Sequence, residues 1–400
     1  MKLMNKILLS LAIISLSLNA SSQSINEFLY EVMENHPGII AGQELLSSEE
    51  AYSKTGYTPK DPSVQAGFFP GRPETTGNKT TWSVNQSFDF PGHYRNIKRL
   101  KKNDYEQAVI EYRFTVMALL EEARASAIEM TALQKHIDSS SERVSHLQAR
   151  EEAYSRMLDE GEITIIEYNK ARLALAQQEN ILRKYNSDME SVKAYLDMIS
   201  GDNSAMIETT AYPLFEEPEP ESLLAEKKEK HPAFSLPGKK IEIAESNISV
   251  IRSDKLPELT LGYASEIVAA SSFTGPTLGL SVPLWENKGR LEAAKARKSH
   301  YRAEYENRIT VMENEFRTGY KEYLSVKSGL ESLRNSLPDR QAKTVLNKAL
   351  EEGKISVIEY FVELSEYYDT EDMVIELEKE YYLLLSKLYN HFPGLIITGF

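Results

Sequence analysis

The nine-residue stretch EGEITIIEY at positions 160–168 returns as EGKISVIEY at positions 352–360, 192 positions later in the chain. The glycine of each copy, Gly161 or Gly353, is typical of the left-handed residue that ends a helix. The Thr-x-x-Glu or Ser-x-x-Glu that follows predicts a capping box at the start of the next helix. Each copy therefore predicts the tip of a helical hairpin.

Two further matches extend the repeat over most of the chain. Asn35-His36-Pro37 returns as Lys230-His231-Pro232, and segment 61–68 returns as segment 256–263, each 195 positions later. Three matches in the same order at a nearly constant offset indicate a duplication. We therefore expect a first structural repeat at 23–200, a linker at 201–220 and a second structural repeat at 221–400.

Apolar residues recur at steps of three and four along the two segments that lead to the tips, from about 91 to 159 and from about 287 to 351. This spacing is typical of a coiled-coil seam. A helix of roughly 65 residues would be about 100 Å long, more than a helix of a compact domain. Pro338 is expected to kink or break the second helix near Asn335, because proline lacks a backbone N–H. Return helices are expected at about 165–200 and 357–390.

Each repeat also carries a pair of segments in which apolar and polar residues alternate, as in a strand with one apolar face. They predict strands at about 62–70 and 80–89, and at about 257–268 and 277–284. The segments 70–79 and 268–276 are rich in Gly, Pro, Ser and Thr and predict loops. The predicted fold class is mainly α with a small β part, built as a duplicated helix, strand pair and long helical hairpin.

The start of the chain and its composition narrow the possible functions. Residues 1–22 have the positive start, apolar stretch and small residues of a signal peptide. There is no cysteine, which excludes disulfides and thiolate metal sites. The net charge of −14 would repel phosphate backbones, so we expect no nucleic-acid binding. No catalytic motif is present and the seven histidines are scattered, so we expect neither an enzyme nor a bound metal or cofactor.

The expected strands cannot satisfy their own edges within one chain. Four strands leave two edges exposed, and the smallest membrane barrel has eight strands. Closure therefore requires several chains. Three chains would supply twelve strands and a ring of tall helices, although two or four chains would also close.

These features together resemble the TolC-like outer-membrane factor (outer membrane efflux protein) family, the exit ducts of tripartite efflux pumps. The resemblance rests on the duplicated order of elements, on Asn-His-Pro at 35–37, on Asp-Phe-Pro-Gly at 89–92 after the strands, and on the two Glu-Gly-x-Ile tips. The Asn-His-Pro and Asp-Phe-Pro-Gly motifs are most similar to the CzcC or CusC heavy-metal efflux branch, which is an analogy of fold and not of site chemistry.

The resemblance implies a homotrimer with a helical α-barrel tunnel across the periplasm and a 12-stranded β-barrel in the outer membrane. Most of the chain would lie in the periplasm. The implied function is passive conduction of solutes, heavy-metal cations among them, to the exterior. The implied partners are a periplasmic adaptor (membrane fusion protein) and an inner-membrane pump of the resistance-nodulation-division (RND) type.

Two sets of tip residues are candidates for function. On three-fold symmetry one acid per chain becomes a ring of three, and rings of acids select cations. The pore or gate candidates are Glu359, Glu363, Glu351, Glu352 and Asp159, whose alternative role is a solvated helix face. The adaptor-contact candidates are Gly161, Ile163, Gly353 and Ile355, whose alternative role is helix capping.

Two other functions stay open from the sequence. A soluble periplasmic coiled-coil adaptor or scaffold would also carry a signal peptide and hairpins, although one hairpin would then suffice. An exit duct of a protein-secretion exporter would share the same fold. Membrane fractionation separates the first alternative from a channel, and the neighbouring genes separate the second.

Overall fold

The computed structural model describes residues 25–72, 77–201, 211–268, 271–285, 288–336 and 341–390. The expected signal peptide, residues 1–22, lies outside this part of the chain. The described residues form two compact units. The strand-bearing unit consists of Ala41–Phe114 and Lys228–Glu313, and the helical unit consists of Thr115–Lys227 with the described residues before Ala41 and after Glu313.

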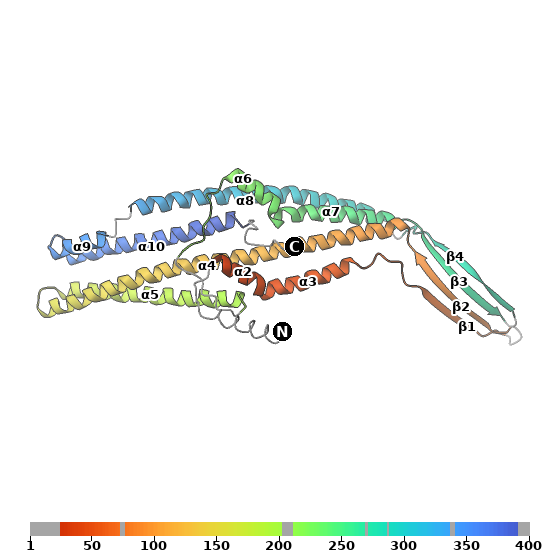
Figure 1. Cartoon of the computed structure of the whole chain (residues 1–400), viewed down its shortest axis with the longest axis horizontal. Helices are drawn as coiled ribbons and strands as arrows, with labels where there is room; N and C mark the ends of the chain where they lie inside the picture. Colours follow the sequence, from red (N-terminus) through yellow and green to blue (C-terminus); the bar gives the residue numbers. More distant parts are fainter. Residues whose placement is uncertain are drawn as a thin grey trace, which may run out of the picture. The chain divides into compact units, whose positions relative to one another are not determined.

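Both copies contain their elements in the same order (Figure 1). The first copy comprises α2 (Ile25–Asn35), α3 (Pro37–Ser53), β1 (Ser63–Phe69), β2 (Lys79–Phe88), α4 (Pro91–Asp159) and α5 (Ile165–Ile199). The second comprises α6 (Pro220–Lys230), α7 (Pro232–Ser253), β3 (Glu258–Val268), β4 (Ser271–Ser281), α8 (Arg290–Ser336), α9 (Gln341–Glu351) and α10 (Val357–Leu388). This order confirms the predicted fold class, mainly α with a small β part and duplicated. The short helices α2 and α6 are additional to the predicted elements.

The His-Pro motif has the same local role in both copies. α3 and α7 each begin at the proline, whose missing N–H would have no helical partner at that position. Nδ1 of His36 accepts a hydrogen bond from the backbone N–H of Gly38 (3.0 Å), and Nδ1 of His231 accepts one from Ala233 (3.1 Å). Both histidines therefore cap a helix, as expected for residues beside such a proline.

The strand-bearing unit contains one antiparallel sheet with the strand order β1-β2-β3-β4 (Figure 1). β2 and β3 come from different copies, and their pairing, with Val84 opposite Tyr263, joins the two strand pairs. β1 and β4 are the edges, and each has one neighbouring strand among the described residues.

One face of this sheet is apolar and exposed. Val64, Val84 and Tyr263 lie opposite one another on three adjacent strands, so their side chains share a face. The register places further exposed apolar side chains on the same face: Phe68, Trp82, Leu259, Leu261, Ile267, Leu278 and Leu280. The opposite face carries mostly polar or small residues, among them Gln65, Ser83, Asn85, Thr260, Gly262 and Thr277.

The prediction of a loop over residues 268–276 is wrong. β3 extends to Val268 and β4 already begins at Ser271, six positions before the predicted start at 277. β4 contains Pro276, which lies opposite Tyr263. Proline cannot donate to a ladder, but β4 is an edge strand, where one side of the backbone needs no partner. The strand also ends at Ser281, short of the predicted residue 284.

Helix α7 packs against both long helices in the strand-bearing unit. The Asn103 amide of α4 donates to Ser246 Oγ (2.8 Å), and the Asn96 amide donates to the Ser249 carbonyl (3.1 Å). On the α8 side, Ile248 and Ile251 form a small cluster with Ala294. The start of α8 is thereby held beside the end of α7.

The helical unit contains two antiparallel hairpins. In the first, α4 leads without a break to its tip, with the predicted bounds, and α5 returns. In the second, the predicted helix over 287–351 is two helices, because α8 ends at Ser336 and α9 begins at Gln341. Pro338 itself lies outside the described residues, but the ends of these two helices agree with the break predicted there.

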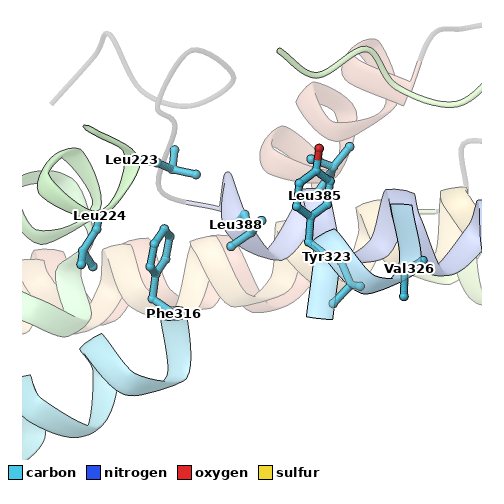
Figure 2. Packing of buried hydrophobic residues seen from close by; sticks show 8 residues of the cluster. Leu223, Leu224, Phe316, Tyr323, Val326, Leu385 and Leu388 are labelled. Atoms are coloured by element: carbon cyan, nitrogen blue, oxygen red, sulfur yellow. The ribbon is translucent and has the colours of Figure 1, made fainter. Parts of the chain in front are cut away.

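A buried cluster holds the second hairpin together away from its tip. Figure 2 shows Leu224 of α6 near Phe316 of α8, and Tyr323 of α8 near Leu385 of α10; Leu223 of α6 belongs to the same cluster. The remaining buried members are Val326, Leu384 and Leu388. Burial of such side chains is the main stabilising contribution to the packing of these helices. None of the helices in the described part of the chain is long and apolar enough to cross a membrane.

Candidate functional site at the helical tips

The two tips are built from the same turn. Gly161 and Gly353 have φ of 76° and 65°, the left-handed region that glycine adopts without a Cβ penalty. The N–H of Glu162 donates to the Met157 carbonyl, and that of Lys354 donates to the Ala349 carbonyl, both at 2.8 Å. This six-to-one bond is the hallmark of a Schellman turn, which ends each incoming helix.

Both predicted capping boxes are present at the start of the return helices. In the second tip Ser356 Oγ accepts from the Glu359 N–H (3.2 Å), and Glu359 Oε2 accepts from the Ser356 N–H (2.7 Å). Thr164 and Glu167 form the same pair in the first tip. The hydrogen bond from the Ser356 backbone holds the pKa of Glu359 below its ordinary value. The carboxylate of this pore candidate is therefore engaged in capping.

The other pore candidates lie on the surface of the tips. Glu363, Glu351 and Asp159 are exposed. Glu352 is held closer to the turn, because its carboxylate contacts Lys354 at 2.5 Å and Lys348 at 3.8 Å. A salt bridge within one tip lowers the charge that Glu352 presents outward.

The adaptor-contact candidates divide by burial. Ile163 and Ile355 are half-buried against the hydrophobic cluster of the tips, so their side chains pack inward. Next to them, Ile166 and Ile358 occupy equivalent positions in the two copies and are 69% and 51% exposed. Ile165 is also exposed. The outward apolar residues of the tips thus lie two or three positions beyond Ile163 and Ile355, in the first turn after the cap.

A tip cluster joins the two hairpins. Its buried members come from α4, α5 and α10: Leu147, Tyr154, Ala171, Tyr360, Phe361, Leu364 and Tyr368. The Tyr360 hydroxyl, on α10, donates to Asn347 Oδ1 of α9 at 2.8 Å. Arg150 of α4 donates to the same oxygen at 2.6 Å. Asn347 therefore receives one hydrogen bond from each hairpin.

Further from the tips, a buried arginine connects α4 to α10. Arg143 is 1% exposed, and its guanidinium contacts Asp372 Oδ1 at 2.8 Å and Glu371 Oε2 at 2.7 Å. It also donates to the Tyr368 carbonyl at 3.2 Å. Such planar, multidentate pairing is specific to arginine and orients both carboxylates.

About two helical turns before Arg143 on α4, His136 belongs to the same network. Its Nε2 is 3.0 Å from Glu376 Oε1, and its ring stacks on Tyr185 of α5 with centroids 4.5 Å apart. Burial lowers the pKa of His136, but the neighbouring Asp372 and Glu376 carboxylates outweigh this and raise it above its ordinary value. The hydrogen bond with His136, assisted by Lys379, lowers the pKa of Glu376 to about 2.

This network was not identified from the sequence. The hydrogen bonds between α4 and α10 in this network join residues 225 to 240 positions apart, so no spacing along one helix reveals them. A usable signal does exist in α10, where Glu371, Asp372 and Glu376 occur close together before Lys379. Among the described residues, no group of three or more His, Asp or Glu side chains is placed to hold a metal ion.

No protein-family model and no curated protein matches the chain by sequence. Solved structures do match it. CusC, described in terms of folding and transmembrane channel formation, is 13% identical with a TM-score of 0.77, covering 93% of this chain and 92% of CusC. The outer membrane protein VceC from Vibrio cholerae is 14% identical with a TM-score of 0.77, covering 92% of this chain and 95% of VceC.

The outer-membrane channel MtrE of Neisseria gonorrhoeae, in its open state, is 13% identical with a TM-score of 0.73, covering 92% of this chain and 88% of MtrE. Likeness at this level of identity concerns the fold. The chain has the fold of these outer-membrane channels over nearly all of its length. The predicted resemblance to the TolC-like outer-membrane factors is confirmed at the level of the fold.

Proposed function

We propose that this chain is an outer-membrane exit channel of a tripartite efflux pump, which passively conducts solutes from the periplasm to the exterior. The observation that carries the proposal is the sheet. One face of it is apolar and exposed, the other is polar, and its edges β1 and β4 are open. In a membrane barrel this is the arrangement of a lipid-facing exterior and a water-filled interior.

Three copies would close this sheet into a 12-stranded barrel. β1 of one copy would pair with β4 of the next, so that no edge stays exposed. The sheet of one chain cannot close alone, because the smallest membrane barrel has eight strands. The long helices α4 and α8 of three copies would form the tunnel in the periplasm, and residues 1–22 would direct export as a signal peptide.

The tips would carry the selectivity and the partner contact. Glu363, Glu351 and Asp159 are exposed acids that three-fold symmetry would repeat as rings, which favours cations as the transported class. Heavy-metal cations are proposed as the substrate because of the Asn-His-Pro and Asp-Phe-Pro-Gly motifs. Ile166 and Ile358 would contact the periplasmic adaptor, because exposed apolar residues on a turn mark an interaction surface. An inner-membrane RND-type pump would supply the substrate.

The experiment is reconstitution of the purified full chain in planar bilayers, together with membrane fractionation. We expect outer-membrane trimers that need detergent and that give stepwise conductance with a preference for cations. Soluble monomers without conductance would support the adaptor or scaffold instead. Conductance from a chain encoded beside an ABC secretion exporter would favour a protein-secretion duct.

The gate assignment is tested in the same recordings with Glu363→Gln, because the carboxylate of Glu359 is already engaged in the cap. Cation preference should fall. Glu190→Gln, an exposed acid on α5, removes the same charge away from the tips and is the matched control. Equal cation preference in wild type and Glu363→Gln would contradict the ring of acids at this position.

A further inference from the structure

A pocket of about 440 Å³ lies between α7 and α8 in the strand-bearing unit. Four cationic side chains line it: Arg252 from α7, and Lys295, Lys298 and Arg302 from α8. The three on α8 are spaced by three and four residues, which places them on one face of that helix. Two helices from one repeat therefore direct their positive side chains into a single pocket.

The positive charge of this pocket is not balanced by the chain. Glu245 is the one acid that lines it, and its carboxylate already contacts Lys298 at 2.7 Å. Within the part of the chain that the structure describes, Arg252, Lys295 and Arg302 have no acidic partner within 4.0 Å. The pocket is therefore positive although the whole chain carries a net charge of −14. Like charges gathered in this way repel one another unless an anion binds between them.

The pocket lies close to the ends of the strands. α7 ends at Ser253, one residue after Arg252, and β3 begins at Glu258. Lys295 is five positions into α8 from Arg290, or about 8 Å along the helix, and Arg302 is about 18 Å along it. If the sheet crosses the membrane as proposed above, Arg252 and Lys295, at the strand end of the pocket, reach the headgroup region, which begins where the apolar face ends.

We infer that this pocket binds the phosphate headgroup of an anionic phospholipid in the membrane leaflet that faces the periplasm. The inference rests on the proposed function, because the membrane position of the sheet brings the headgroups to the pocket. Two arginines and two lysines match a phosphate, arginine by paired donors and lysine as a point charge. Basic residues beside an anionic leaflet are attracted to it in the same way. Free phosphate presents the same chemistry, and the experiment separates the two sources.

The experiment is native mass spectrometry of the detergent-purified full chain, titrated with dioleoylphosphatidylglycerol or with zwitterionic dioleoylphosphatidylcholine. The variant is the triple substitution Arg252→Gln, Lys295→Gln and Arg302→Gln. We expect its apparent affinity for phosphatidylglycerol to fall by at least about ten-fold, while phosphatidylcholine binding is unchanged. The charge-preserving triple Arg252→Lys, Lys295→Arg and Arg302→Lys should retain binding within about two-fold, which excludes a folding defect at these positions.

The matched control is the triple substitution Arg297→Gln, Arg308→Gln and Arg317→Gln, which removes the same charge from exposed positions on α8 that do not line the pocket. It should change phosphatidylglycerol affinity by less than about two-fold. If the Gln triple in the pocket and the control Gln triple lost equal affinity for phosphatidylglycerol, the inference would be overturned, because general surface charge would then explain both losses. Displacement of phosphatidylglycerol by millimolar inorganic phosphate would also overturn it and assign the pocket to free phosphate.

The two proposals can fail separately. A chain that conducts in planar bilayers but binds both lipids equally would overturn the lipid site and leave the channel intact. If the Gln triple in the pocket no longer formed trimers but still bound phosphatidylglycerol, the pocket would lie at a contact between copies. That result would also overturn the lipid site. Preserved trimers with selective loss of phosphatidylglycerol would support it.

Discussion

The two hairpins of the helical unit share a turn but differ in the helix that leads into it. In the first hairpin, α4 continues from Pro91 to Asp159. In the second, α8 ends at Ser336, and the stretch before the tip is the separate 11-residue helix α9. A helix of 11 residues is marginal in water without tertiary contacts. The two tips therefore have the same local geometry but different sources of stability.

Helix α9 is not continuous with α8, and its side-chain contacts hold it in place instead. Leu346 and Leu350 pack against the tip cluster, and Asn347 is bound by Arg150 of the first hairpin. Lys343 also contacts Glu142 of α4 at 3.2 Å. The first hairpin is thus a continuous scaffold, and side-chain contacts hold the second hairpin against it.

The largest effect is expected from Arg143→Ala. The substitution leaves Glu371 without its cation and Asp372 with His136 alone, and removal of one partner of a buried ion pair costs about 3–5 kcal/mol. Hydrogen exchange followed by mass spectrometry should show α10 exchanging at least about 100-fold faster near residues 368–376, since about 3 kcal/mol corresponds to that factor. The tip end of α5 should change little, because the ion pairs that are lost join Arg143 to carboxylates of α10.

Arg183→Ala is the control for this prediction. Arg183 is an exposed residue of α5, so its removal takes away one positive charge without opening a buried pair. We expect exchange in α10 to stay within about two-fold of wild type. Equal acceleration of both hairpins in Arg143→Ala would contradict the view that the first is the scaffold.

The same network should be less stable at both low and high pH. The pKa of Glu376 is lowered to about 2. The pKa of Asp372 is also lowered, because its contacts with His136 and Arg143 outweigh its burial. The stabilisation by these two carboxylates is therefore present above about pH 4.5 and lost as pH falls further. The pKa of His136 is raised, so its contribution is full below 6.5 and lost as pH rises through the raised value. Stability of the helical unit should peak between about pH 5 and 6.5.

Thermal midpoints from far-ultraviolet circular dichroism across this range provide the measurement. His136 faces Asp372, Glu376 and Tyr185, and Lys379 lies beyond Glu376. His136→Gln should flatten the decline above pH 6.5 and reduce the decline below pH 4.5, which Lys379 and Arg143 still maintain in part. A His136→Gln profile that still declines above pH 6.5 would assign the alkaline limb to another group.

Local patterns predicted the parts of this fold that depend on neighbours in sequence. The bounds of α4, the glycine turns and both capping boxes follow from spacing, caps and breakers within one segment. The first half of β4 was missed because its Gly275 and Pro276 have the composition of a loop, and only its place at the edge of the sheet makes the strand possible there. Strand length here is decided by pairing and not by propensity.

The exposure and packing of the tip residues were harder to predict than the fold for a related reason. Sequence placed the tips but not which of their residues point outward, so Ile163 and Ile355 were selected where Ile166 and Ile358 are the exposed pair. Arg143 was missed because its partners lie on a helix more than 220 residues away. Contacts between distant helices depend on the packing of whole elements, which no single segment encodes.

A smaller effect is expected from removing one hydroxyl from each tip. Tyr360 is 1% exposed and its hydroxyl binds Asn347 of α9, so Tyr360→Phe should cost about 1–2 kcal/mol. The equivalent Tyr168 is half-buried, and its hydroxyl donates to Glu151 at 2.8 Å, where water can replace it. Exchange should accelerate about five-fold or more in α9 for Tyr360→Phe, and less than about three-fold near Glu151 for Tyr168→Phe. Similar accelerations would mean that α9 does not depend on this hydrogen bond.

The smallest effect tests what the two tips share. Thr164→Ala and Ser356→Ala each remove the hydroxyl that accepts the N–H of the capping glutamate, at 3.3 Å and 3.2 Å. Loss of such an N-cap costs about 1 kcal/mol, and the two costs should agree within about 0.5 kcal/mol because the turn geometry is the same. Exchange at the first turns of α5 and α10 measures both. A much larger effect for Ser356→Ala would show that the cap also supports α9, and the difference between the hairpins would then begin at the turn itself.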